Sequence, residues 1–234
     1  MSSSRPVAII TGASGNLGRA VADKLLVDGF EIVRIGSSQP KAASGNQAEN
    51  PAYDASLFVQ ADATDQASMG RAVEEVLTHF GRIDALVHTV GGFTMGKMVH
   101  ETSADDFEKM MQVNVRSLLA TAHAVVPSMI AKGRGRIVFV SAVNAGRGLA
   151  GMGAYIAAKS AVARLTESMS EELRHKGINV NCIMPSTMAT PQNRAAMGDA
   201  VMVPLEDVAS VCAFLVSEGA RSVHGAAIPV RGLT

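Results

Sequence analysis

A chain of 234 residues in which 47% of the side chains are apolar can form one domain with a sizeable core, which excludes a disordered protein. Twenty-one basic residues balance 21 acidic ones, and only 4% of the residues are aromatic. This balance argues against a nucleic acid or a membrane surface as a partner. Two cysteines, Cys182 and Cys212, are too few for a disulfide scaffold and indicate a reducing compartment.

The amino-terminal residues do not resemble an export signal. A polar start leads into a short apolar run that ends at Thr11, which is too short for a signal-peptide core. No segment approaches the roughly 20 apolar residues of a membrane span. We therefore expect a cytoplasmic protein whose partner is a small molecule.

Short β-branched runs alternate with longer helical patterns along the chain. Strands are predicted at 7–10, 31–35, 56–60, 83–89, 136–140, 178–183 and 227–230, and helices at 16–28, 69–80, 104–131, 153–175 and 205–217. Uninterrupted alternation of this kind requires crossover helices between parallel strands. The predicted fold is therefore α/β: a single-domain, doubly wound, Rossmann-like sheet of about seven strands with helices on both faces.

Two segments have no periodic pattern. Residues 37–54 are rich in serine, glycine, asparagine and proline, which predicts a mobile surface loop. Residues 185–203 contain prolines and methionines between a predicted strand and a predicted helix. We expect this second segment to form a lid over a substrate.

A glycine-rich loop follows the first predicted strand and opens the first predicted helix. Such a loop lets the backbone approach a pyrophosphate, and the helix N-terminus offers N–H donors. The alternative is an ordinary tight turn, but the position after the first strand favours dinucleotide binding. The residues expected at the cofactor are Gly12, Ser14, Gly15, Asn16, Leu17 and Gly18.

Tyr155 and Lys159 lie four residues apart in a predicted helix, so both side chains share one face. A phenol with a pKa of about 10 becomes useful for proton transfer at neutral pH when an ammonium group is close. Together with the glycine loop, this pair makes the chain resemble the short-chain dehydrogenase/reductase family from about residue 6 to the C-terminus. The resemblance implies an NAD(P)-dependent oxidoreductase, with residues 1–234 as one dinucleotide-binding domain.

The resemblance also implies roles for individual residues. Tyr155 would be the general acid or base, Lys159 would lower its pKa and hold the cofactor ribose, and Asn114 would anchor a proton relay. Asp62 with Ala63 would lie beside the adenine, and Gly91 beside the ribose. Pro185, Thr187 and Thr190 would lie near the nicotinamide. The six histidines show no metal-ligand spacing, so no metal is expected.

Three residues depart from the family pattern. His88 stands where an asparagine is usual, and Ala142 stands thirteen residues before Tyr155, where a substrate-polarising serine is usual. Ser141 is one residue earlier, and neighbouring side chains on a strand point to opposite faces, so it can orient a substrate only if the strand ends or bulges there. The loop also carries Asn16 where glycine is frequent, and asparagine tolerates a left-handed backbone.

These departures leave three functions open. The first is hydride transfer to or from a small, largely apolar carbonyl or alcohol. The alanine at position 142 also resembles dihydropteridine reductases, whose quinonoid substrate needs less polarisation. A non-catalytic, cofactor-binding sensor is the alternative of another class, but the presence of Asn114, Tyr155 and Lys159 together favours an enzyme.

The end of the second predicted strand bears on the choice of cofactor. It leads into Gly36-Ser37-Ser38, without the carboxylate that binds the ribose hydroxyls of NAD. Ser37 and its neighbours can accept a phosphate, so NADP(H) is favoured over NAD(H). Arg19 and Lys41 are expected to be solvated.

By resemblance, the long helices 104–131 and 153–175 would pair copies of the chain into a homodimer or homotetramer.

Overall fold

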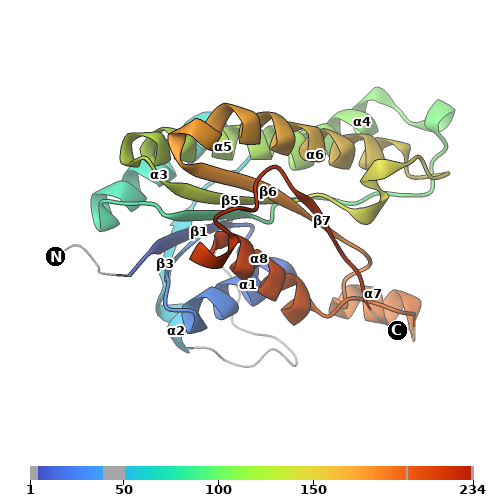
Figure 1. Cartoon of the computed structure of the whole chain (residues 1–234). Coiled ribbons are helices and arrows are strands. Elements are labelled where there is room, and N and C mark those ends of the chain that lie inside the picture. Colours follow the sequence, from blue (N-terminus) through green and yellow to red (C-terminus); the bar gives the residue numbers. More distant parts are fainter. Residues whose placement is uncertain (1–4, 39–50, 199, 233–234) are drawn as a thin grey trace.

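The computed structural model describes residues 5–38, 51–198 and 200–232. Seven parallel strands form one sheet in the order β3-β2-β1-β4-β5-β6-β7 (Figure 1). The strands are β1 (Val7–Thr11), β2 (Glu31–Gly36), β3 (Leu57–Gln60), β4 (Ala85–His88), β5 (Gly135–Val140), β6 (Ile178–Pro185) and β7 (Ala227–Val230). The predicted doubly wound α/β fold is confirmed.

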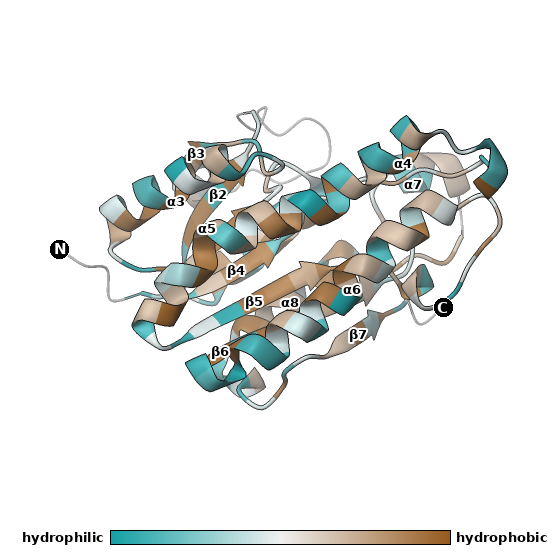
Figure 2. Ribbon diagram, turned by 90° about the horizontal axis from the view of Figure 1, so that it is seen from above, coloured by the Kyte–Doolittle hydropathy of each residue, from teal (hydrophilic) through white to brown (hydrophobic). Residues whose placement is uncertain are grey.

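Helices cover both faces of the sheet. Viewed from above, α3, α5 and α6 lie over one face, and α1 and α8 lie under the other (Figures 1 and 2). The helices are α1 (Asn16–Val27), α2 (Pro51–Ala55), α3 (Gln66–Phe80), α4 (Ala104–Met111), α5 (Ser117–Lys132), α6 (Gly153–Leu173), α7 (Pro191–Met197) and α8 (Leu205–Val216). None of these described helices is both long and apolar enough to span a bilayer.

The strands are apolar on both faces because both faces are covered. In β1, Ile9 packs in the cluster under α3, α5 and α6, whereas its neighbour Ile10 packs in the cluster with α1 and α8. The same alternation separates Val138 from Phe139 in β5. Two cores of buried aliphatic side chains therefore hold the sheet between its helical layers.

The helix predicted over 104–131 is interrupted, which corrects that prediction. A π-helical turn, Gln112–Arg116, separates α4 from α5. The side chain of Asn114 in this turn donates to the carbonyl oxygens of Met110 (3.0 Å) and Gly92 (3.2 Å). The bond to Gly92 connects this turn to the segment after β4. Single π-helical turns inside helices are frequent at functional sites.

The loop predicted over 37–54 is corrected at its C-terminal end, where the structure has a helix. Residues 39–50 of this segment, including Lys41, lie outside the described part of the chain. Residues 51–55 form α2, and Tyr53 is fully buried. Its hydroxyl donates to the carbonyl oxygen of Ala13 (2.8 Å), and the guanidinium groups of Arg19 and Arg34 lie 4.7 and 4.5 Å from its ring centre. Arg19, expected to be solvated, is therefore buried in a cation–π contact.

The strand order places a topological switch point between β1 and β4. From β1 the chain proceeds outward through β2 and β3, and it then returns to β4 on the other side of β1. Connections that leave in opposite directions open a crevice beyond the carboxyl ends of the two strands, which is where ligands bind in open α/β sheets. The residues that follow β1 and β4 are therefore the natural start of a functional site.

Candidate active site

The turn after β1 requires glycine. Gly12 has a φ of +71°, and a Cβ at this residue would lie 2.9 Å from the backbone nitrogen of Val90. Its carbonyl oxygen accepts the N–H of Gly15 (2.9 Å), which is the N-cap residue of α1 and has no side chain to cap the helix. The first N–H groups of α1 therefore have no side-chain cap, and they lie beside the glycine turn. This arrangement fits a bound pyrophosphate.

The other loop residues differ in what they offer a ligand. Ser14 is exposed and donates weakly to the carbonyl oxygen of Ser38 (3.4 Å). The side chain of Leu17 is packed in the core, which leaves only its backbone for a cofactor. Asn16 begins α1, and no described residue other than glycine has a positive φ, so the loop closes without a left-handed backbone at Asn16. Its amide donates to Gln192 of α7 (3.1 Å).

Three predicted site residues meet at the carboxyl end of β4. A Cβ on Gly91 would lie 2.9 Å from Oδ1 of Asn114 and 3.0 Å from Nζ of Lys159, so both polar atoms approach the Gly91 backbone closely. The same oxygen of Asn114 accepts the N–H of Gly92 (3.2 Å). Asn114 and Lys159 are buried, and only glycine leaves room for them at position 91.

Tyr155 lies one helical turn before Lys159 in α6, and the ring of Phe93 meets its ring edge-on at 4.9 Å. Burial raises the pKa of the Tyr155 phenol. Burial also lowers the pKa of Lys159 to about 8, and its Nζ donates to the carbonyl oxygen of Val140 (2.9 Å). The Tyr155 pKa is therefore raised and not lowered as expected, and the phenol remains protonated at neutral pH.

Ser141 does not provide a hydroxyl for a substrate. It is buried just beyond β5, and its Oγ donates to the carbonyl oxygen of Lys159 (2.7 Å), inside α6. Ala142 follows it and offers only a methyl group. In the structure this hydroxyl of Ser141 holds the end of β5 against α6, so the contact does not favour the orienting role expected for Ser141.

The residues predicted to hold the adenosine part lie at the ends of β2 and β3. Ser37 is exposed, and its carbonyl oxygen accepts a hydrogen bond from Gln60 (3.0 Å). Oδ1 of Asp62 accepts both the N–H and the hydroxyl of Thr64 (2.8 Å each), which shapes the turn before α3. Ala63 is buried beside it.

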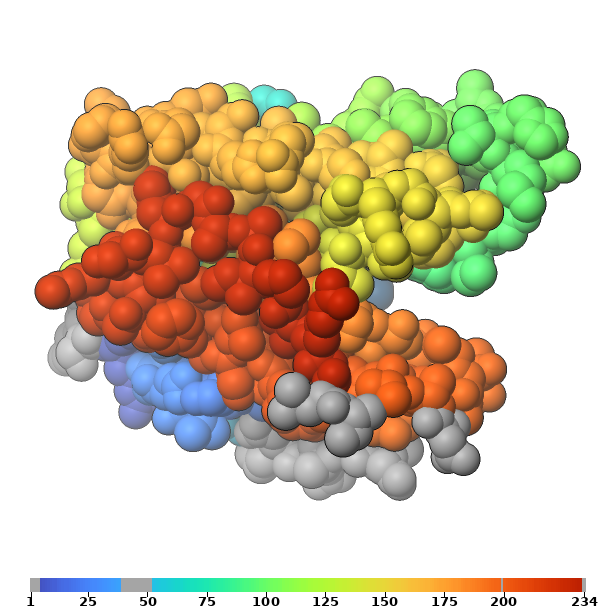
Figure 3. All heavy atoms as spheres, turned by 45° about the vertical axis from the view of Figure 1, so that its right-hand side comes forward, coloured from blue at the N-terminus to red at the C-terminus, as the bar shows by residue number. Residues whose placement is uncertain are grey.

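The segment 185–203 contains α7 and is attached at several points. Pro185 ends β6, and Thr187 accepts the N–H of Val203 through its carbonyl oxygen (2.8 Å). The hydroxyl of Thr190 accepts the N–H of Asn193 and caps α7. Figure 3 shows a hollow between this segment, in orange, and the residues around 150, in yellow.

His88 forms a hydrogen-bond chain that the sequence pattern did not reveal. Its Nδ1 lies 2.7 Å from Oγ1 of Thr11, and its Nε2 lies 3.2 Å from Oγ of Ser117. Ser117 already donates its proton to the carbonyl oxygen of Val113 (2.7 Å), so Nε2 must be the donor to Ser117 and Thr11 must donate to Nδ1. The neutral imidazole thus links the glycine loop to the π-helical turn that carries Asn114.

Comparisons with known proteins agree with this geometry. The family model described as short chain dehydrogenase matches residues 6–199. The chain is 32% identical to 2-(R)-hydroxypropyl-CoM dehydrogenase of Xanthobacter autotrophicus, with 97% of each chain covered. It is 29% identical to the 3-oxoacyl-[acyl-carrier-protein] reductase FabG of Salmonella typhimurium, covering 99% of this chain and 98% of the relative.

A solved structure is similar over almost the whole chain. Carveol dehydrogenase from Mycobacterium avium, crystallised in complex with NAD, superposes with a TM-score of 0.84 at 25% identity, and 98% of each chain is covered.

The environment of His88 predicts a pH dependence of stability. Burial, together with the charge of Lys159, lowers the His88 pKa to about 3, from 6.5 in an unfolded chain. Below pH 6.5 the unfolded chain therefore binds a proton that the folded chain does not. The contribution of His88 to the free energy of unfolding is therefore complete above pH 6.5 and is lost as the pH falls. We expect this contribution to decrease by about 2 kcal/mol from pH 8 to pH 5.

Urea unfolding at pH 8, 6.5 and 5 measures this dependence. The variant His88→Asn should lose this part of the pH dependence, whatever its stability at pH 8. The matched control is His79→Asn, which replaces an exposed histidine and should keep the wild-type pH dependence. Equal pH dependence in the wild type and in His88→Asn would contradict the neutral, buried imidazole.

Proposed function

The chain belongs to the short-chain dehydrogenase family, and we propose that it transfers a hydride between a nicotinamide dinucleotide and a small, largely apolar carbonyl or alcohol, with Tyr155 as general acid or base. The convergence of Asn114 and Lys159 on Gly91, one turn of helix away from Tyr155, is the observation that carries this proposal. These groups lie at the switch point of the sheet, beside a loop built for a pyrophosphate.

The cofactor fits the residues that are present. Gly12 and the N-terminus of α1 would hold its pyrophosphate, and Gly91 with Lys159 would hold the ribose next to the nicotinamide. When bound, the nicotinamide supplies or accepts the hydride. A side chain of the protein must donate the proton, because hydride addition to a carbonyl leaves an oxyanion that must be protonated.

Tyr155 donates that proton in the direction of reduction. Its raised pKa keeps the phenol protonated before reaction, and Lys159, with a pKa of about 8, is predominantly cationic at pH 7. The ammonium group stabilises the phenolate that forms when the proton leaves. Asn114 holds the segment after β4 against the π-helical turn and thereby anchors the relay that returns a proton to the phenolate.

The surroundings of Tyr155 favour an apolar substrate. Phe93, Met95 and Met98 follow β4 and expose large apolar side chains, and Met197 does the same at the end of α7. Flexible methionine side chains adapt to irregular apolar ligands. The lid predicted over 185–203 would close over such a substrate from the α7 side.

One observation supports a second candidate, the reduction of a quinonoid dihydropterin. Ala142 cannot polarise a carbonyl, and the hydroxyl of Ser141 is bound to the backbone of Lys159. A substrate that accepts a hydride without strong carbonyl polarisation suits this site. Turnover with quinonoid dihydropterin, and none with a panel of diketones and ketones, would select this candidate over the first.

Replacement of Tyr155 by phenylalanine tests the central role. Tyr155→Phe keeps the ring contact with Phe93 and removes only the hydroxyl, so turnover should fall by about 100-fold or more while the cofactor dissociation constant changes little. Steady-state NAD(P)H oxidation and fluorescence titration of the cofactor measure the two quantities. The control is Thr78→Val, which removes an exposed hydroxyl from α3 and should leave both quantities unchanged. Turnover of Tyr155→Phe at the wild-type rate would show that another acid acts or that the chain is a cofactor-binding sensor.

We propose further that NADP(H) is preferred over NAD(H). Strand β2 ends at Gly36, so no carboxylate at that residue repels a 2′-phosphate, and the exposed Ser37 follows it. Arg19 and Arg34 both lie against the Tyr53 ring, so the attraction for a phosphate is modest. A preference of about 1–2 kcal/mol is expected, the size of a partly exposed charge-assisted contact.

Gly36→Asp should reverse that preference. A Cβ at this position would lie 3.4 Å from Oγ of Ser14 and 3.7 Å from the Phe58 ring, which are ordinary contacts, so the variant should fold. The new carboxylate would bind the ribose hydroxyls of NADH and repel the phosphate of NADPH. Parallel titrations of both cofactors check this, with Gly36→Asn as the uncharged control. A wild-type protein that binds NADH more tightly would contradict the proposed preference.

We also propose assembly into a homodimer or homotetramer through α5 and α6. Leu119 and Ile130 on α5 are exposed apolar side chains, and α6 presents the small, exposed Ala157. Burial of such residues between copies would remove apolar surface from water. Light scattering at micromolar concentration should give a mass two or four times that of the chain; a monomer would refute the assembly.

A further inference from the structure

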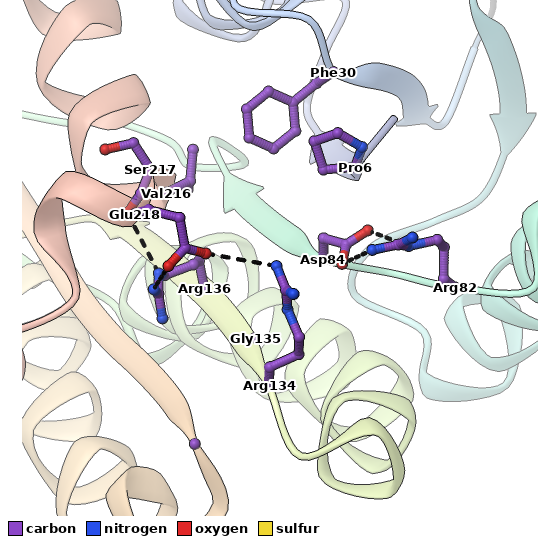
Figure 4. Close-up of a pocket in the computed structure, with 11 residues that line it drawn as sticks. Pro6, Phe30, Arg82, Asp84, Arg134, Gly135, Arg136, Val216, Ser217 and Glu218 are labelled. Atoms are coloured by element: carbon purple, nitrogen blue, oxygen red, sulfur yellow. Dashed lines mark hydrogen bonds and ion pairs between the residues drawn. The ribbon is translucent and has the colours of Figure 1, made fainter. Parts of the chain in front are cut away.

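A cavity lies at the opposite edge of the sheet from Gly12 and Gly91. It has a volume of about 710 Å3, within the range of small-molecule sites, and it opens where the strands begin (Figure 4). Pro6, Asp84 and Gly135, which precede or begin β1, β4 and β5, line it. Because the strands are parallel, this edge is separated from the candidate active site by the length of the sheet.

Three arginines and two carboxylates line this cavity, and one carboxylate is already fully engaged. Asp84 accepts the backbone N–H of Val7 (2.9 Å), pairs with Arg82 through both oxygens (2.7 and 2.8 Å) and also contacts Lys132. Burial acts to raise the pKa of Asp84, but these hydrogen bonds outweigh it and lower the pKa to about 2. Asp84 therefore stays charged and is matched by two cations.

The other two arginines share a single carboxylate, that of Glu218. Its Oε1 lies 3.5 Å from Arg134 and its Oε2 lies 3.3 Å from Arg136, so each pairing is long. The Glu218 side chain is 79% exposed, and it begins the short 3₁₀ helix Glu218–Ala220 after α8. Exposed pairs of this kind contribute between zero and about 1 kcal/mol, so this carboxylate is readily displaced.

The guanidinium of Arg136, in contrast, is held in place. Its side chain is only 14% exposed, and it donates to Oδ1 of Asn179 and weakly to the carbonyl oxygen of Ser217 (3.5 Å). Figure 4 shows Arg134 and Arg136 on one side of the cavity, with Phe30 and Pro6 across from them. The cavity is therefore lined by the fixed guanidinium of Arg136, by that of Arg134 beside it, and by the apolar side chains of Phe30 and Pro6.

We propose that this cavity binds a small phosphate monoester whose phosphate displaces the Glu218 carboxylate from Arg134 and Arg136, with its apolar part against Phe30 and Pro6. A phosphate dianion can pair with both guanidinium groups at full charge, whereas a monocarboxylate would only repeat the contact that Glu218 already makes. The site is independent of the proposed hydride transfer, because it shares no residue with the candidate active site.

Phenyl phosphate is the probe, titrated by calorimetry against the full chain in saturating NADPH, which occupies the phosphate sites of the candidate active site. Glu218→Gln removes the internal competitor and should tighten binding about five-fold, and Arg134→Gln should weaken it by a similar factor. Both side chains are exposed, so both variants should fold. The control variants, Glu206→Gln and Arg164→Gln, change exposed residues elsewhere and should leave the affinity unaltered.

Three results would overturn the proposal. The first is the absence of phenyl phosphate binding at millimolar concentration. The second is binding that neither Glu218→Gln nor Arg134→Gln changes. The third is equally tight binding of phenol, which would show an apolar cavity without a phosphate subsite. A loss of catalytic activity in any variant bears on the proposed function alone, since calorimetry with phenyl phosphate does not depend on turnover.

Discussion

The hydrogen bond between Thr11 and His88 joins β1 and β4, the two strands between which the strand order reverses. β1 and β4 are adjacent, Thr11 and His88 are register partners, and their side chains meet at 2.7 Å at the carboxyl ends of both strands. From His88 the chain of donors continues through Ser117 to the backbone of Val113, next to Asn114. One neutral imidazole therefore couples the glycine loop, the strand end and the π-helical turn. These are the parts of the site that must keep their relative positions when a ligand enters.

The parallel direction of the strands gives the molecule two chemically different edges. At the carboxyl edge, glycines allow polar atoms of the backbone and of side chains to approach one another closely, as at Gly12 and Gly91. At the amino edge, charged side chains gather around Asp84, where strands begin and loops are short. The first edge is suited to a ligand that contacts the backbone, and the second to a ligand that meets guanidinium groups. The two proposed sites follow from this asymmetry.

The fold and the order of its elements could be predicted because they depend on local patterns. Apolar runs such as 7–10 and the spacing of apolar residues in 69–80 each reflect one strand or one helix face, and all seven predicted strands are present. The interruption at Asn114 could not be predicted, because it coincides with hydrogen bonds to Gly92, a residue 22 positions away. The burial of Tyr53 depends in the same way on Arg19 and Arg34, whose contacts arise only after folding.

The candidate site shows the same division between local and non-local information. The spacing of Tyr155 and Lys159 is a property of one helix, and the structure retains it. The role of Ser141 depended on the direction of one side chain relative to another element, and the structure directs its hydroxyl into α6.

The contact between Ser141 and Lys159 has a chemical consequence. Ser141 is bound to the carbonyl oxygen of Lys159, and Ala142 offers only a methyl group. Under the proposed function, the phenol of Tyr155 would then be the principal proton donor for a substrate oxygen. A site with one donor stabilises a developing oxyanion less than a site with two, so it favours substrates that are already activated toward hydride, such as diketones or quinonoid rings, over simple ketones.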